Sequence, residues 1–187
     1  MDKTKIIFLR HADTQKDPNL NAALWGLSEE GKKQAKKTAN LSIMNDINVI
    51  YVSEEKKTTL TVESLAKKIG KEIIPLSFFN EVKRGDKFLT KEEFEAEKVK
   101  QLKDLNYHAF DGESGNEALM RFKQGVRQAL KENVGKTILI VTHGTILNIY
   151  FADLLKAYDK LPERWQKTVF CAYGVIENEK VIKDIIL

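Results

Sequence analysis

Short apolar runs alternate along the chain with longer stretches in which apolar residues recur at helical spacing. A run of four to eight apolar residues is typical of a buried strand, whereas apolar residues three and four positions apart indicate one face of a helix. On this basis we predict strands over residues 6–9, 49–52, 73–76, 137–141, 169–176 and 181–186. We predict helices over residues 28–43, 57–69, 90–102 and 145–156, and a further helix opened by a capping box at Ser114.

The order of these elements, with strands separated by helices, is typical of a mainly parallel sheet covered by helices on both faces. We therefore expect a three-layer α/β/α sandwich. Pro75 lacks a backbone donor, so the strand at 73–76 is expected near an edge of the sheet. In sheets of this kind ligands bind beyond the carboxyl ends of the parallel strands, and the residues that follow those strands are therefore the first candidates for a site.

Composition limits the class of protein. The chain has 187 residues, 42% of them hydrophobic and 31% charged, which favours a single globular domain over residues 1–187. No run approaches the roughly 20 apolar residues that a membrane span needs. The single cysteine, Cys171, cannot form an internal disulfide, so we expect a cytoplasmic protein. The net charge of +4 comes from lysines interleaved with glutamates, which argues against a nucleic-acid partner.

Two of the three histidines directly follow predicted buried strands. His11 comes after Arg10 at the end of the first strand, and His143 precedes Gly144 at the end of the strand at 137–141. The third, His108, lies in a charged stretch and is expected at the surface. An imidazole is a competent nucleophile toward phosphorus, and a guanidinium holds two phosphoryl oxygens at once. This set of residues therefore favours phosphoryl transfer.

A metal site is the competing interpretation of the same residues. His11 and His143, together with Asp13 or Glu81, form a set that can bind Zn²⁺ or Fe²⁺. The guanidinium of Arg10 stands next to His11 in the sequence and argues against a cation there. We therefore predict a site without a metal ion or another cofactor.

Four sequence elements resemble, in the same order, those of the histidine phosphatase superfamily, also called phosphoglycerate-mutase-like. The family's hallmark Arg-His-Gly-Glu-Thr is met by Arg10-His11-Ala12-Asp13-Thr14, and its Leu-Thr-x-x-Gly-x-x-Gln-Ala by residues 27–35. A Gly-Glu-Ser before the next helix is met by Gly112-Glu113-Ser114, and the second histidine by Val141-Thr142-His143-Gly144. The likeness runs from about residue 4 to 176, and it implies the fold and the chemistry of this family.

The resemblance implies a role for each matching residue. His11 is expected to be the nucleophile that becomes phosphohistidine, while Arg10, His143 and Gly144 are expected to bind the phosphoryl group. Glu81 matches the family's proton donor. We expect partial burial to raise the pKa of Glu81, so that it can hand a proton to the leaving oxygen.

The pattern departs from the family where its second phosphate-binding arginine is expected. Lys57 stands at that position, and a lysine delivers a point charge instead of a two-pronged clamp. Two carboxylates, Glu54 and Glu55, stand nearby, and Glu54 replaces the motif's proline. Asp17 stands where the family commonly has asparagine, and its carboxylate would repel a phosphate if it pointed inward. Either Lys57 binds the phosphate in place of the arginine but less rigidly, which predicts a reduced activity, or the pocket has changed its ligand.

Three functions agree with these residues. The first is a phosphatase that hydrolyses the monoester of a small phosphorylated substrate. The alternative is a catalytically weak or silent relative that binds a phosphorylated ligand or a partner protein. The third, a mutase, needs larger lid segments to shield the phosphohistidine from water than the expected lid at residues 83–110. The oligomeric state is open, with a dimer as one option.

The expected lid and the loop after the first strand supply the candidates for substrate contact. They are Thr14, Asp17, Arg84, Lys87, Phe88 and Tyr107.

Overall fold

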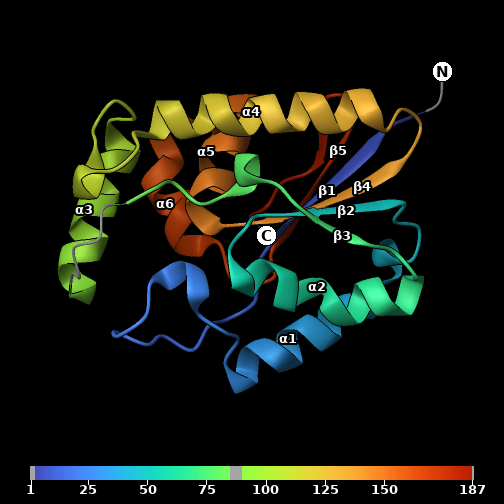
Figure 1. Cartoon of the computed structure of the whole chain (residues 1–187). Coiled ribbons are helices and arrows are strands. Elements are labelled where there is room, and N and C mark those ends of the chain that lie inside the picture. Colours follow the sequence, from blue (N-terminus) through green and yellow to red (C-terminus); the bar gives the residue numbers. More distant parts are fainter. Residues whose placement is uncertain (1–2, 85–89, 187) are drawn as a thin grey trace.

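A computed structural model describes residues 3–84 and 90–186 of the chain. Its centre is a six-stranded sheet with the strand order β3-β2-β4-β1-β5-β6 (Figure 1). The strands are β1 (Lys5–Arg10), β2 (Val49–Val52), β3 (Ile73–Pro75), β4 (Thr137–Thr142), β5 (Tyr173–Glu177) and β6 (Lys180–Lys183). β3 forms one edge of the sheet, as Pro75 predicts.

The sheet is mixed and mainly parallel. β1 pairs in parallel with β4, β4 with β2, and β2 with β3. The last two strands reverse this direction, because β5 is antiparallel both to β1 and to β6. The predicted strand at 169–176 begins four residues late, since Cys171 adopts a positive φ of 56° and turns the chain just before β5. The predicted strand at 181–186 ends early, at Lys183.

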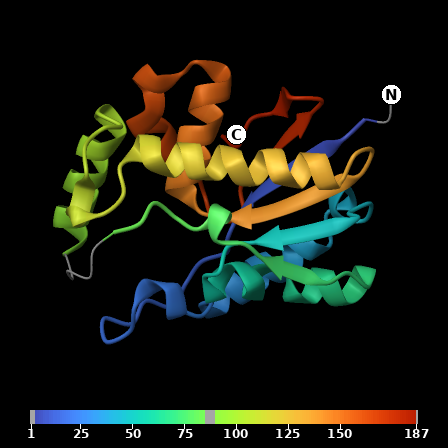
Figure 2. The ribbon, with the colours of Figure 1, turned by 45° about the horizontal axis from the view of Figure 1, so that its top comes forward.

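Helices cover both faces of the sheet, so the predicted three-layer arrangement is confirmed. The helices are α1 (Glu29–Ala39), α2 (Lys56–Ile69), α3 (Lys91–Lys103), α4 (Gly115–Glu132), α5 (Gly144–Leu155) and α6 (Leu161–Lys167). α1 and α2 lie on one face, and α4 and α5 lie on the other (Figure 2). α3 packs against α6 beside this second layer.

The two-sided burial explains why the first strand is apolar throughout. Ile6 and Phe8 belong to the core that includes Phe122 of α4, whereas Ile7 and Leu9 belong to the core on the α1 and α2 side. All four strand residues are at most 1% exposed. A strand buried on both faces reads as a continuous apolar run rather than as an alternating one.

Two helix predictions need correction. The helix predicted over 28–43 ends at Ala39, because the side chain of Asn40 donates to the carbonyl oxygen of Lys36 at 3.1 Å and residues 42–44 form a separate 3₁₀ turn. The seven-residue helix α6 was not predicted, since so short a segment carries too few apolar positions to show a helical period. The start of α4 is confirmed, with Ser114 and Glu117 forming the predicted capping box.

Candidate active site

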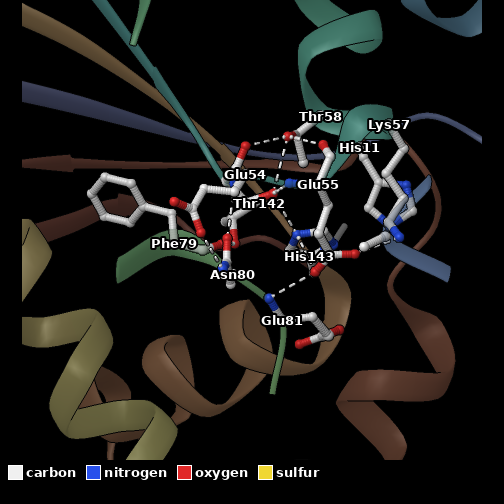
Figure 3. A network of polar contacts seen from close by, with 12 residues as sticks. His11, Glu54, Glu55, Lys57, Thr58, Phe79, Asn80, Glu81, Thr142 and His143 are labelled. Carbon is white, nitrogen blue, oxygen red and sulfur yellow. Dashed lines mark hydrogen bonds and ion pairs between the residues drawn. The ribbon is translucent and has the colours of Figure 1, made fainter. Parts of the chain in front are cut away.

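The two histidines that follow predicted strands lie side by side (Figure 3). β1 and β4 are parallel neighbours with Arg10 in register with Thr142, so the residues that follow both strands leave the sheet at the same edge. The ring centroids of His11 and His143 are 5.1 Å apart, and the ring planes are inclined by 61°. Both side chains are buried. The fold therefore brings together two imidazoles that are distant along the chain.

His11 is held in one tautomer. Its Nδ1 lies 2.8 Å from the carbonyl oxygen of Ala12. A carbonyl oxygen only accepts hydrogen bonds, so Nδ1 carries the hydrogen and Nε2 keeps its lone pair. Burial, together with His143, lowers the pKa of His11 well below its usual value. The ring is therefore neutral at neutral pH, and Nε2 is available as a nucleophile.

In His143 it is Nε2 that carries a hydrogen, in contrast to His11. Its Nε2 lies 2.8 Å from Ser53 Oγ and 3.2 Å from Glu55 Oε1. A carboxylate only accepts, so Nε2 carries a hydrogen that it can share between these two oxygens. Burial lowers the pKa of His143, although Glu55 and Glu81 act in the opposite direction. His143 is therefore suited to donate a hydrogen bond to an anionic oxygen.

Arg10 packs its guanidinium against the segment between α6 and β5. Its Cζ lies 4.3 Å from the ring centroid of Phe170, and its Nη1 donates to the carbonyl oxygen of Thr168. Among the described residues, nothing accepts a hydrogen bond from its buried Nε. Gly144 provides the room, because a Cβ at that position would lie 3.0 Å from Arg10 Nε. Gly144 therefore lets the guanidinium lie against the first residue of α5.

Lys57 lies in the first turn of α2 and is only 6% exposed. Its Nζ donates to the carbonyl oxygen of Ala22 at 2.7 Å and lies 2.5 Å from Glu55 Oε2. The centroid of the Trp25 ring lies 5.9 Å from the same ammonium nitrogen. The cation predicted to bind phosphate therefore has a carboxylate of the same chain as its counter-ion.

Glu55 is a site residue that the sequence did not distinguish from its neighbour Glu54. Besides Lys57 and His143, its carboxylate accepts a hydrogen bond from the backbone N–H of Glu81 at 3.2 Å. Burial acts to raise the pKa of Glu55, but His143 and Lys57 outweigh it and lower the pKa overall. Glu54 turns the other way and accepts from the side chain of Asn80. Side-chain direction, which the sequence does not give, separates the two glutamates.

The predicted rise in the pKa of Glu81 is wrong. The Glu81 carboxylate accepts hydrogen bonds at 2.9 to 3.0 Å from three backbone N–H groups, those of Val82, Thr145 and Ile146. Burial alone would raise the pKa of Glu81, but His143, Lys98 and the backbone donors lower it to about 2. The carboxylate is therefore ionised at neutral pH, and it holds the N-terminus of α5 next to His143.

The other candidates in the loop after β1 make local contacts. Asp17 Oδ1 accepts a hydrogen bond from the backbone N–H of Asn19 at 2.9 Å, so this carboxylate is used within its own loop. Thr14 pairs with Leu27 in an isolated antiparallel bridge. Their proposed contact with substrate stays a prediction.

Aromatic rings and cations from three segments lie next to one another. Arg84 Cζ lies 6.0 Å from the ring centroid of Trp25 and 5.6 Å from that of Phe94. Lys98 Nζ lies 5.7 Å from the Phe94 centroid and donates to Gln101 Oε1 at 3.0 Å. Burial lowers the pKa of Lys98 to about 8, with Glu81 opposing and Arg84 adding to the shift. The sequence singled out Arg84, but it gave no signal for Trp25, Phe94 or Lys98.

Tyr107 and His108, in the segment between α3 and α4, make contacts with neighbouring parts of the chain. The hydroxyl of Tyr107 donates to Glu97 Oε2 at 2.8 Å. His108 is exposed, as predicted, and its Nδ1 lies 2.9 Å from the carbonyl oxygen of Gly112. Lys87 and Phe88, which were also predicted to contact the leaving group, lie outside the described residues.

Two further properties concern the described part of the chain. Within residues 3–84 and 90–186, no three or more His, Cys, Asp or Glu side chains gather where they could hold a metal ion. None of the helices in these ranges is long and apolar enough to cross a bilayer.

Fold and site together define a class of α/β proteins in which paired histidines stand at the carboxyl ends of neighbouring parallel strands. The model of the histidine phosphatase superfamily (branch 1) matches residues 6–181. The chain therefore belongs to this superfamily.

Solved structures share the fold at low sequence identity. Bacillus stearothermophilus YhfR is 19% identical, with a TM-score of 0.80 over 98% of both chains. Mycobacterial glucosyl-3-phosphoglycerate phosphatase is 17% identical, with a TM-score of 0.79 over 99% of this chain and 100% of that chain. A mutant Entamoeba histolytica phosphoserine phosphatase with bound phosphoserine is 23% identical, with a TM-score of 0.72 over 92% of this chain and 89% of that chain. No curated protein matches in sequence.

Proposed function

We propose that this protein hydrolyses phosphate monoesters through a phosphohistidine on His11, without a metal ion. The observation that carries the proposal is the neutral His11, whose Nε2 keeps its lone pair and whose ring centroid lies 5.1 Å from that of His143, with the Arg10 charge close enough to help lower the pKa of His11. Phosphoserine phosphatase and glucosyl-3-phosphoglycerate phosphatase share the fold, which supports this reaction class. The single Cys171 favours a reducing compartment such as the cytoplasm.

In the first step, Nε2 of His11 attacks phosphorus. The P–N bond forms as the bond between phosphorus and the leaving oxygen breaks, and the negative charge stays on the three remaining phosphoryl oxygens. Arg10, Lys57 and the N–H of His143 stabilise these oxygens electrostatically. In the second step water attacks phosphorus, the P–N bond breaks, and inorganic phosphate leaves with His11 restored.

The proton balance assigns a role to Glu81. The leaving oxygen gains one proton in the first step, and the attacking water loses one in the second, so a single acid can serve both steps. Glu81 is our proposed donor because its carboxylate lies next to His143 at the start of α5. Its pKa of about 2 applies to a site that holds no phosphoryl group. A bound dianion adds like charge and raises the pKa of Glu81, which the proposal requires.

We further propose that the leaving group of a small substrate lies toward Arg84. The guanidinium of Arg84 lies near the rings of both Trp25 and Phe94, and Trp25 also lies beside Lys57. Contacts therefore lead from Lys57 through Trp25 and Arg84 to Phe94 of α3. The leaving group would therefore meet a cation and aromatic faces.

A second candidate function is binding of a phosphorylated ligand without turnover. The contact between Glu55 and Lys57 favours it, because the cation expected to stabilise the transferring group already has an anionic partner. Wild-type protein that binds inorganic phosphate but hydrolyses no phosphoester would identify this function.

The test of hydrolysis is phosphate release from a panel of phosphoesters by wild type and by two matched histidine variants. We expect His11→Ala to lower kcat by at least a factor of about 1,000, since the covalent route is lost. His108→Ala, which removes an exposed imidazole in the segment between α3 and α4, should leave kcat unchanged. Turnover that survives in His11→Ala refutes the mechanism.

A further inference from the structure

The carboxylate of Glu55 stands among the groups assigned to phosphate. One oxygen lies 2.5 Å from Lys57 Nζ, and the other lies 3.2 Å from His143 Nε2 (Figure 3). The second oxygen also accepts the backbone N–H of Glu81 at 3.2 Å. Three donors from three separate segments therefore converge on one carboxylate.

These three donors are of the kind that binds a phosphoryl group. An ammonium, an imidazole N–H and a backbone N–H each donate to an anionic oxygen, and a carboxylate offers two such oxygens in a planar array. Lys57 and His143 are the groups proposed here to bind the phosphoryl oxygens. A phosphoryl oxygen and the Glu55 carboxylate consequently compete for the same hydrogens.

Helix capping does not account for this arrangement. Glu55 is the N-cap residue of α2, yet its side chain makes no capping hydrogen bond to the helix. The neighbouring Glu54 hydrogen-bonds with Asn80 through both its backbone N–H and its carboxylate. A glutamate in this turn can therefore find a partner other than these three donors. The Glu55 side chain is 15% exposed, which leaves it room to move toward solvent.

We propose that Glu55 is an internal anion that occupies part of the phosphate position in the free protein and exchanges with the phosphoryl group during binding. Binding of phosphate breaks the contacts of Glu55 with Lys57 and His143, and departure of phosphate restores them. Glu55 therefore weakens the affinity for inorganic phosphate and speeds its release. This inference rests on the proposed phosphate site.

Calorimetric titration with inorganic phosphate tests the exchange. We expect Glu55→Gln, which keeps the size but removes the charge, to lower the Kd for phosphate about tenfold, because one close like charge is removed. Glu54→Gln is the matched control and should bind phosphate as wild type does. Inhibition by phosphate during turnover should strengthen by the same factor in Glu55→Gln only.

A second measurement uses the wild-type protein and does not depend on how the variants fold. In a crystal structure of the phosphate complex, we expect the Glu55 carboxylate to lie more than 4 Å from Lys57 Nζ, with a phosphate oxygen in its place. A complex in which Glu55 and phosphate both contact Lys57 overturns the exchange. So does a Glu55→Gln protein that binds phosphate no more tightly than wild type.

Phosphate binding by wild type and by Glu55→Gln distinguishes an error in the role of Glu55 from an error in the phosphate site itself. If wild type and Glu55→Gln both fail to bind phosphate, the phosphate site itself is wrong. If both bind it equally well, only the role of Glu55 is wrong.

Discussion

At the scale of single residues, Arg10 and Lys57 present positive charge in different ways. Arg10 is a planar fork fixed by Phe170 and Thr168, whereas Lys57 is a point charge between Ala22 and Glu55. A guanidinium can hold a carboxylate and a phosphoryl oxygen through separate N–H groups, but an ammonium distributes three hydrogens from one nitrogen. The lysine therefore limits how many anionic oxygens can be held in a fixed geometry.

We expect Lys57→Arg to raise kcat/KM for a phosphomonoester about fivefold, since a bidentate contact replaces a point contact. The measurement is initial-rate kinetics of phosphate release. Lys56→Arg makes the same change on an exposed neighbouring residue and should have no effect. A rate that falls in Lys57→Arg contradicts the view that the missing fork limits the enzyme.

His11 offers a prediction about pH. Burial lowers its pKa well below 6.5, so the ring stays neutral as the pH falls through 6.5 and takes up a proton only at clearly lower pH. NMR titration of the His11 Cε1–H signal, assigned by its disappearance in His11→Ala, should give a midpoint clearly below 6.5. A midpoint at or above 6.5 would mean that the nucleophile is substantially protonated near neutral pH.

The sequence allowed some residues of the site to be predicted but not others. His11 and His143 could be found because each directly follows a strand whose two-sided burial is visible in the sequence. The contact of Glu55 with Lys57 could not, because two adjacent glutamates look alike until the turn before α2 sets their directions. The pKa of Glu81 was misjudged for a related reason. Two of its three backbone donors belong to α5, more than 60 residues away in the chain.

At the scale of elements, the N-terminus of α5 depends on a residue from another segment. His143, the N-cap residue, makes no side-chain capping bond, and Glu81 instead accepts from the N–H groups of Thr145 and Ile146. A carboxylate at this end also interacts favourably with the helix dipole. Glu81 therefore orients the first turn of α5, which begins directly after His143.

This interaction of Glu81 with α5 makes the free energy of unfolding depend on pH. The pKa of Glu81 is about 2 in the folded chain against an ordinary 4.5, so the unfolded chain binds the proton more readily. Its contribution of about 3 kcal/mol is fully present above pH 4.5 and is lost as the pH falls toward 2.

We expect Glu81→Gln to lower the free energy of unfolding by about 1–3 kcal/mol at pH 7, because an amide replaces a carboxylate that accepts three backbone hydrogen bonds. Urea unfolding at pH 7 and at pH 3.5 measures both effects. The difference between wild type and Glu81→Gln should shrink at the lower pH, and Glu54→Gln should behave as wild type does. An equal difference at both values would show that the charge of Glu81 does not stabilise α5.

The order of elements was predictable at this scale, whereas some of their ends were not. The parallel strands read as continuous apolar runs because helices cover both faces of the sheet. The start of β5 and the end of α1 are set by single residues, Cys171 with its positive φ and Asn40 with its side-chain cap. Such local features leave little trace in a hydrophobic pattern.

At the scale of the whole molecule, the substrate approach proposed above combines segments from distant parts of the chain. Trp25 comes from the loop after β1, Arg84 from the segment after β3, and Phe94 and Lys98 from α3. Arg84 and Lys98 both lie within 6 Å of the centroid of the Phe94 ring, at 5.6 and 5.7 Å. Two cations beside one ring favour a leaving group that carries negative charge of its own.

The charge of the leaving group can be varied while the phosphomonoester group stays the same. We compare 4-carboxyphenyl phosphate with phenyl phosphate, which differ by one carboxylate. We expect Arg84→Gln to raise KM about fivefold for the carboxylated ester and to leave KM for phenyl phosphate unchanged, because the lost cation contacts only the carboxylate. Arg127→Gln, which removes an exposed arginine of α4, should change neither. An equal rise in KM for both esters would place Arg84 at the phosphoryl group, and no change for either would remove it from the substrate path.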